Sequence, residues 1–153
     1  MLEVGSTAPT FTLPDQDGTD VALEQFAGTP VVVYFYPRDD TPGCTTQACG
    51  IRDQWGEFQE AGAAVLGVSP DDVASHARFA DKHDLPHRLL ADPDGEVIRA
   101  YGAWGIKNRY GREYEGVIRS TVLVGPDGRV AAVWPKVKPA DHADEVLEAI
   151  REL

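Results

Sequence analysis

The sequence has few of the features that membranes and nucleic acids require of a partner. No apolar run approaches the ~20 residues needed to cross a bilayer, and the N-terminus lacks the basic and apolar regions of a signal peptide. Lysine and arginine number 14 against 25 acidic residues, and the resulting net charge of −11 disfavours binding to phosphate backbones or anionic lipids. We therefore expect a cytoplasmic protein that binds neither. The acidity indicates a solubility requirement, with a salt-rich cytoplasm as the alternative.

Cysteine is also scarce, and its scarcity excludes a disulfide-stapled fold. Two cysteines cannot brace 153 residues in the way that several disulfides brace a small secreted domain. A pair in a reducing compartment indicates redox catalysis or metal binding instead. A structural zinc site needs a full tetrahedral set of ligands, and no second cysteine pair exists. The histidines are spread along the chain, and we expect ordinary surface residues at His76, His83, His87 and His142.

Neither repeats nor low-complexity segments interrupt the chain, so we expect one domain over residues 1–153. A hairpin is predicted where Phe11–Leu13 and Val21–Leu23 flank a glycine-containing turn. Val31–Tyr36 is a continuous β-branched and aromatic run, typical of a buried central strand. Further strands are predicted over Val65–Val68, Ser120–Val124 and Val130–Val133, with helices near residues 71–84 and 146–150. The alternation predicts a three-layer α/β domain with a mixed sheet.

Cys44 follows the predicted central strand and falls in the first turn of a helix. The free N–H groups and positive dipole at a helix start favour an anion, and hence the reactive thiolate. Most free cysteines are merely small buried hydrophobes, but such a residue needs no helix start. Cys49 lies on a more solvated flank. Apolar residues at helical spacing form one face of this helix: Ala48, Ile51, Trp55 and Phe58. Cys44 falls on the same face, so we expect it to point toward the protein interior.

This segment resembles the active-site signature of the peroxiredoxins, Pro-x-x-x-Thr-x-x-Cys, at Pro37, Thr41 and Cys44. The Thr-Pro-Gly-Cys-Thr form, with a second cysteine five positions on, is typical of the peroxiredoxin Q (bacterioferritin comigratory protein) branch. The similarity continues through Tyr101–Gly105 and Gly116–Leu123 and covers nearly the whole chain.

The resemblance implies a thioredoxin-like α/β fold with an N-terminal hairpin extension. It also implies a peroxidase in which Cys44 attacks a hydroperoxide and Cys49 then forms a disulfide with it. Thr41 would hold the peroxide oxygens, and Arg119 would stabilise the thiolate and the leaving oxygen. Without the resemblance, Arg119 would equally be a surface arginine at a strand start. Pro37 would wall off the pocket.

Substrate contacts are further expected from the backbone N–H groups of Gly43 and Cys44. Gln47 shares the helical face of Cys44 and is a second candidate, with a solvated side chain as the equal alternative. The resemblance implies a thioredoxin-type dithiol as reductant and a monomeric protein, and no metal or organic cofactor is needed.

Two other functions compete with this interpretation. A general thiol–disulfide oxidoreductase usually has Cys-x-x-Cys, and the longer spacing here argues against it. A copper-handling module on the same fold would need a histidine placed to join both cysteines, and none is identifiable in the sequence.

Overall fold

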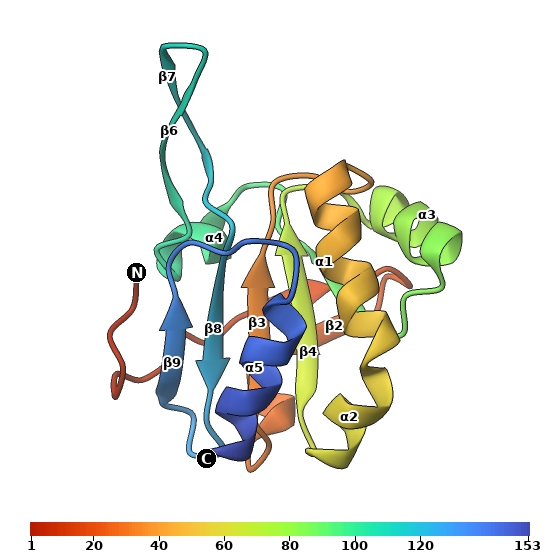
Figure 1. The fold of residues 1–153 in the computed structure, drawn as a ribbon, viewed down its shortest axis with the longest axis vertical. Coiled ribbons are helices and arrows are strands. Elements are labelled where there is room, and N and C mark those ends of the chain that lie inside the picture. The colour runs from red at the N-terminus through yellow and green to blue at the C-terminus, as the bar shows by residue number, and fades with distance from the viewer.

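A five-stranded mixed sheet of order β5–β4–β3–β8–β9 forms the centre of the computed structural model, which describes residues 1–153 (Figure 1). The central strand pairs in parallel with β4 and antiparallel with β8, and all five of its residues are buried. This confirms the buried central strand and the mixed sheet. The strands are β3 (Val31–Phe35), β4 (Ala64–Ser69), β5 (Arg88–Ala91), β8 (Ser120–Val124) and β9 (Val130–Trp134).

Two layers cover the two faces of this sheet. Alternate residues of β3 enter different hydrophobic clusters: Val32 and Tyr34 pack with the helices of one layer, and Val33 packs with the opposite layer. The first layer contains α1 (Pro42–Asp53), α2 (Trp55–Glu60), α3 (Val73–His83) and α5 (His142–Arg151). The second contains the predicted hairpin, β1 (Thr12–Pro14) with β2 (Asp20–Ala22), then the 3₁₀ turn η1 (Leu23–Phe26) and α4 (Glu96–Ala100). The three-layer α/β prediction is confirmed.

The structure adds β5 and α4 to the predicted elements, and it differs further from the sequence prediction at one helix and one hairpin. The stripe from Cys44 to Phe58 is divided, because Gln54 leaves helical geometry (φ −113°) between α1 and α2. Strands β6 (Trp104–Arg109) and β7 (Arg112–Val117) form a hairpin that stands out from the body (Figure 1). Its residues are mostly exposed and polar, so it carries no buried alternation to detect. No helix has the length and apolarity that a membrane span requires.

The expectation of surface histidines is wrong for three of the four. His76, His87 and His142 are 0%, 1% and 4% exposed. Each is buried because a distant side chain bonds to it: His87 Nε2 lies 2.7 Å from the Tyr34 hydroxyl, and His142 Nε2 lies 2.8 Å from Thr121 Oγ1. Such partners leave no local mark in the sequence.

Two of these histidines should make the fold sensitive to acid. Burial lowers the pKa of His87 to about 3, and burial together with the Arg119 charge lowers that of His142 to about 4. Because an unfolded histidine titrates near ~6.5, the unfolded chain takes up protons that the folded chain does not as the pH falls below that value. The free energy of unfolding should therefore decrease from about pH 6.5 downward.

Urea denaturation over this pH range measures the effect. The double variant Tyr34→Phe/His87→Leu removes one histidine together with its bonded hydroxyl, and it should lose less stability than the wild type on acidification. An unchanged pH slope in that variant would contradict the assignment.

Candidate active site

Cys44 lies in the first turn of α1, where the chain turns back from the carboxyl end of β3. Its side chain is buried, only 2% of the residue being exposed, and it belongs to the hydrophobic cluster on the helical side of the sheet. Cys49 lies further along the same helix and is partly exposed; both thiols are free. The structure confirms that one sulfur is sheltered at a helix start and the other is more accessible.

A guanidinium group lies against the buried sulfur. Arg119 Nη2 donates a hydrogen bond to Cys44 Sγ at 3.2 Å, and Nη1 donates to Gln47 Oε1 at 2.8 Å. Arg119 directly precedes β8, so adjacent strands β3 and β8 bring together residues that are 75 positions apart. A permanently charged planar donor at this distance stabilises a thiolate and orients the cysteine side chain.

Gln47 holds this guanidinium in place, and Gly43 leaves room for it. Gln47 is 2% exposed, and while its oxygen accepts from Arg119, its Nε2 has no partner. A Cβ atom at Gly43 would lie 3.1 Å from Arg119 Nη2 and 3.4 Å from Pro139 Cγ. Glycine at this position therefore permits the close approach of Arg119 to the start of the helix. Gln47 lies on the helical face of Cys44, as expected, and it is buried and not solvated.

The loop before Cys44 supplies further polar groups for an incoming oxygen. The N–H groups of Gly43 and Cys44 have no hydrogen-bond partner within the chain, as expected in the first turn of a helix. Thr41 is the N-cap residue, and its hydroxyl donates to the Arg38 carbonyl at 2.8 Å. With its proton so engaged, Thr41 Oγ1 is free to accept a hydrogen bond. Pro37 follows the strand and is half-buried.

A buried hydrogen-bond network that the sequence did not reveal connects this loop to α3. Asp39 accepts hydrogen bonds from the Tyr36 hydroxyl at 2.6 Å and the Ser75 hydroxyl at 2.8 Å, and it lies 2.7 Å from His76 Nδ1. His76 Nε2 lies 2.9 Å from the Leu90 carbonyl, so both ring nitrogens face acceptors. The network fastens the active-site loop to α3.

Asp39, His76 and Asp71 also have the side-chain types and proximity of a metal site. Asp71 accepts from the Asp39 N–H at 2.8 Å and from the Ser69 hydroxyl at 2.7 Å. Hydrogen bonds within the protein therefore account for the cluster as a structural support.

Comparison with known proteins gives similarity over nearly the full length. Residues 4–133 match the AhpC/TSA family. Peroxiredoxin Bcp of Escherichia coli is 45% identical over 151 residues, and that of Bacillus subtilis is 41% identical over 152 residues; each alignment covers 99% of this chain and 97% of the relative.

Solved structures give the same result. Peroxiredoxin Q of Xanthomonas campestris has a TM-score of 0.90 at 42% identity, covering 99% of this chain and 96% of that one. The bacterioferritin comigratory protein of the same organism, studied for alkyl peroxide reduction in trapped-intermediate and ligand complexes, has a TM-score of 0.90 at 41% identity, covering 99% and 97%.

Proposed function

This chain belongs to the AhpC/TSA family of peroxiredoxins and is a thiol-dependent peroxidase with a thioredoxin-like fold, and we propose that Cys44 attacks the peroxide and Cys49 resolves the product. The observation that carries this assignment is the hydrogen bond from Arg119 to Cys44 Sγ at 3.2 Å. The sulfur of Cys49 accepts no hydrogen bond from a cationic side chain, and Cys49 lies on the more exposed flank of α1.

In the first step, the Cys44 thiolate attacks one peroxide oxygen. The S–O bond forms as the O–O bond breaks, and the leaving oxygen takes up a proton to become an alcohol or water. Cys44 is then a sulfenic acid. Arg119 and the free N–H groups of the helix start stabilise the negative charge that moves from sulfur to the leaving oxygen. Thr41 Oγ1 accepts the hydrogen bond of the peroxide O–H.

In the second step, the Cys49 thiol loses its proton and the thiolate attacks the Cys44 sulfur. The S–S bond forms as the S–O bond breaks, and the leaving hydroxide takes up that proton to become water. Helix α1 is continuous from Pro42 to Asp53 and so includes both cysteines. Residues five apart in a regular helix have Cα atoms ~8.7 Å apart, whereas a disulfide generally needs ~6.8 Å or less. The first turns of α1 must therefore unwind before the disulfide can form.

Replacing Gly50 with alanine should slow disulfide formation without slowing the attack on peroxide. A Cβ atom at Gly50 meets nothing within 4 Å, so alanine fits. It should stabilise the helix by about 1 kcal/mol, which corresponds to roughly fivefold slower unwinding. Gly56→Ala is the matched control, because Gly56 is equally uncrowded but lies in α2, beyond both cysteines.

Stopped-flow tryptophan fluorescence resolves the two steps, and hydrogen exchange over residues 44–52 reports the unwinding. The disulfide form should exchange much faster than the dithiol form. An equal effect of both alanine substitutions on disulfide formation, or a disulfide form with α1 still regular through Cys49, would refute the unwinding step.

Hydrogen peroxide and organic hydroperoxides are the proposed substrates, and a thioredoxin-type dithiol protein is the proposed reductant. The alkyl peroxide reduction of the Xanthomonas campestris relative supports the organic substrates. We further propose that the chain acts as a monomer in the cytoplasm, where its two thiols would be kept reduced.

Peroxide consumption by the wild-type protein tests this function. Dithiothreitol should sustain turnover of hydrogen peroxide and of an alkyl hydroperoxide. A general thiol–disulfide oxidoreductase would instead reduce insulin disulfides in the absence of peroxide, and that activity without any peroxide consumption would overturn the proposal.

A further inference from the structure

The β6–β7 hairpin concentrates the exposed apolar side chains of the molecule. Ile106, Tyr110 and Tyr114 are 69%, 91% and 44% exposed, and every other large hydrophobic residue with comparable exposure lies within four residues of a chain end. Apolar side chains gathered on a projecting element mark an interaction site. A two-stranded hairpin that stands alone in water is also only marginally stable, which favours a partner that covers it.

The strand register divides the hairpin into two unlike faces. Paired residues lie on the same side of a ribbon, so the pairs Lys107–Tyr114 and Arg109–Arg112 share one side. We call this side, together with Tyr110 at the turn, the basic face. The Lys107 ammonium and the Arg109 guanidinium lie 6.0 Å and 5.3 Å from the rings of Tyr114 and Tyr110.

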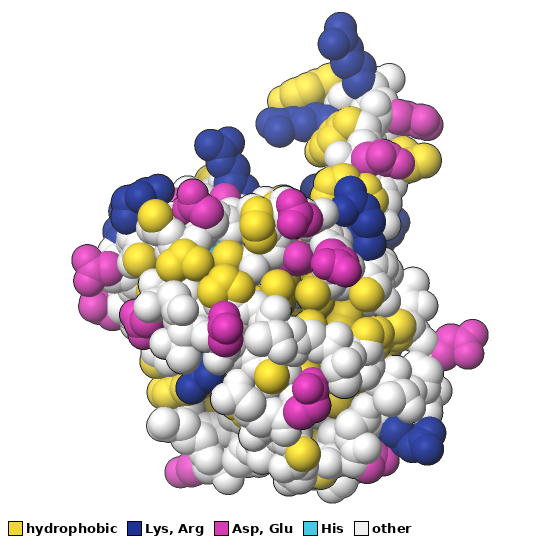
Figure 2. Space-filling view, turned by 180° about the vertical axis from the view of Figure 1, so that it is seen from behind, with side chains coloured by type: hydrophobic (Ala, Val, Ile, Leu, Met, Phe, Trp, Pro, Cys, Tyr) yellow, Lys and Arg dark blue, Asp and Glu magenta, His cyan; other side chains and the backbone are white.

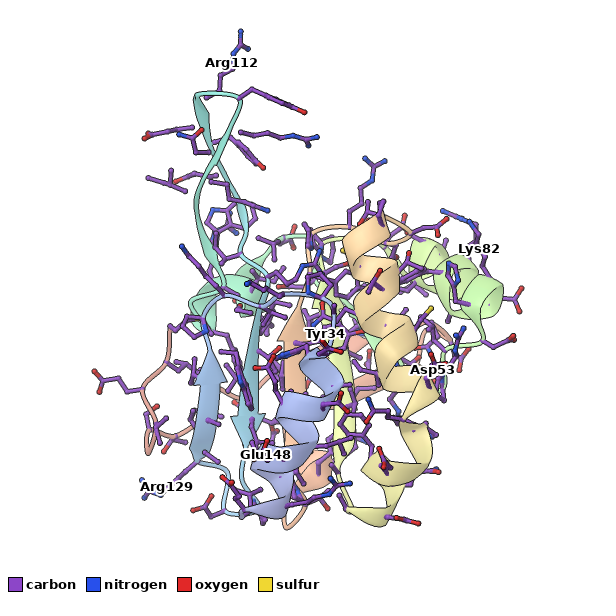
Figure 3. The ribbon with its side chains drawn as sticks, viewed as in Figure 1. Tyr34, Asp53, Lys82, Arg112, Arg129 and Glu148 are labelled. Atoms are coloured by element: carbon purple, nitrogen blue, oxygen red, sulfur yellow. The ribbon has the colours of Figure 1, made fainter.

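The opposite side carries acidic residues. Ile106 pairs with Glu115, and Asn108 pairs with Glu113. Figure 2 shows the division, with dark-blue and yellow side chains along one edge of the projecting hairpin and magenta side chains, beside a further yellow one, along the other. Arg112 lies at the far end of the hairpin (Figure 3). Three cations thus gather on one face in a chain of net charge −11.

The basic face is the side of the hairpin nearer the active site. The Lys107 stem passes Gly116, and its Nζ donates to the Val117 carbonyl at 2.9 Å, two residues before Arg119. Burial and then the Arg119 charge lower the pKa of Lys107, while the Cys44 charge opposes that shift. The Val137 N–H donates to the Arg119 carbonyl at 3.0 Å, which brings the Lys136–Lys138 segment to the same rim.

We propose that the basic face is the docking surface for the dithiol protein that reduces the Cys44–Cys49 disulfide; this inference rests on the proposed function. Such a partner would present an apolar patch with an acidic rim around its own cysteines. One partner thiolate attacks a sulfur of the disulfide and releases the other as a thiolate. The second partner thiol then attacks the partner's own sulfur in the mixed disulfide and releases the cysteine of this chain. The partner leaves with an oxidised pair, and both cysteines of this chain are reduced again.

The size of the surface favours this occupant over a second copy of the chain. The two exposed tyrosines of the basic face, Tyr110 and Tyr114, present roughly 300 Å², whereas a stable interface buries about 800 Å² on each partner. Redox encounters fall at the small end of the range, because the partner must leave after each transfer. The cations would speed its arrival if its surface is acidic.

Substitutions on the two faces test the proposal with thioredoxin, thioredoxin reductase and NADPH as the reducing system. Tyr114→Ser and Arg112→Glu on the basic face should each lower kcat/KM for thioredoxin by roughly tenfold. Ile106→Ser on the opposite face is the matched control and should stay within about twofold of wild type. None of the three should change peroxide consumption with dithiothreitol. Arg112→Glu should also weaken the salt dependence of the thioredoxin reaction.

Each other outcome overturns the docking surface. Equal losses of kcat/KM for thioredoxin from substitutions on both faces, or no loss from those on the basic face, would contradict the proposal. A wild-type protein that turns over with dithiothreitol but not with thioredoxin would contradict it as well. Dimers by analytical ultracentrifugation that Tyr114→Ser dissociates would assign the face to a second copy. Failure to consume peroxide even with dithiothreitol would instead contradict the proposed function.

Discussion

Replacing Cys44 with serine should abolish peroxidase turnover, whereas Cys49→Ser should still consume about one equivalent of peroxide in a single turnover. Cys44 is the sulfur that receives the Arg119 hydrogen bond at the start of α1, and serine in its place has no thiolate to attack the peroxide. Cys49→Ser leaves that site intact and removes only the thiol that closes the disulfide. Peroxide consumption with and without reductant measures both variants.

The two variants exchange behaviour if the roles are reversed. A first turnover in Cys44→Ser, with none in Cys49→Ser, would assign the attacking thiol to Cys49. Both substitutions are nearly isosteric, and matching circular dichroism spectra would exclude unfolding as the cause of inactivity.

The second large effect should come from Arg119→Met, which should slow the peroxide step by roughly 10²-fold or more. Methionine keeps much of the apolar bulk but removes both hydrogen bonds of the guanidinium, one to Cys44 Sγ and one to Gln47 Oε1. The charge that moves onto the leaving oxygen then lacks its principal cation. Thr41→Val, which removes the hydroxyl oxygen that accepts from the peroxide, should have an effect of similar size.

Stopped-flow measurement of sulfur oxidation tests this prediction, with Arg129→Met as control. Arg129 is an exposed arginine bonded to the Gly5 carbonyl, and it lies at the opposite end of the sheet from the hairpin (Figure 3). Reduction of the preformed disulfide by dithiothreitol should change little in either variant. A peroxide rate near wild type in Arg119→Met would show that this arginine has no part in the chemistry.

Local signals predicted most of the fold. The run Val31–Phe35 is apolar at every position, and only a central strand covered on both faces explains it. The helix predicted near residues 71–84 is α3, and the Asp72 side chain caps it by accepting from the Ser75 N–H. The interruption at Gln54 was not predicted, because the apolar spacing continues across this residue although the helical backbone conformation is interrupted there.

The candidate site was predictable to the extent that it is local. Cys44 could be placed at a helix start from its own segment, but the contact with Arg119 spans 75 positions. Only the family resemblance indicated that contact in advance. The support of the loop by Asp39 and His76 was missed altogether, because the two residues are 37 positions apart and Asp39 occupies a position that the active-site signature leaves unspecified.

Chemical trapping of the sulfenic acid tests the central claim most directly. Cys49→Ser treated with one equivalent of hydrogen peroxide and then dimedone should give a single adduct that peptide mass spectrometry places on Cys44. Cys44→Ser treated in the same way should give none. An adduct on Cys49 in Cys44→Ser, with Cys44 unmodified in Cys49→Ser, would contradict the account.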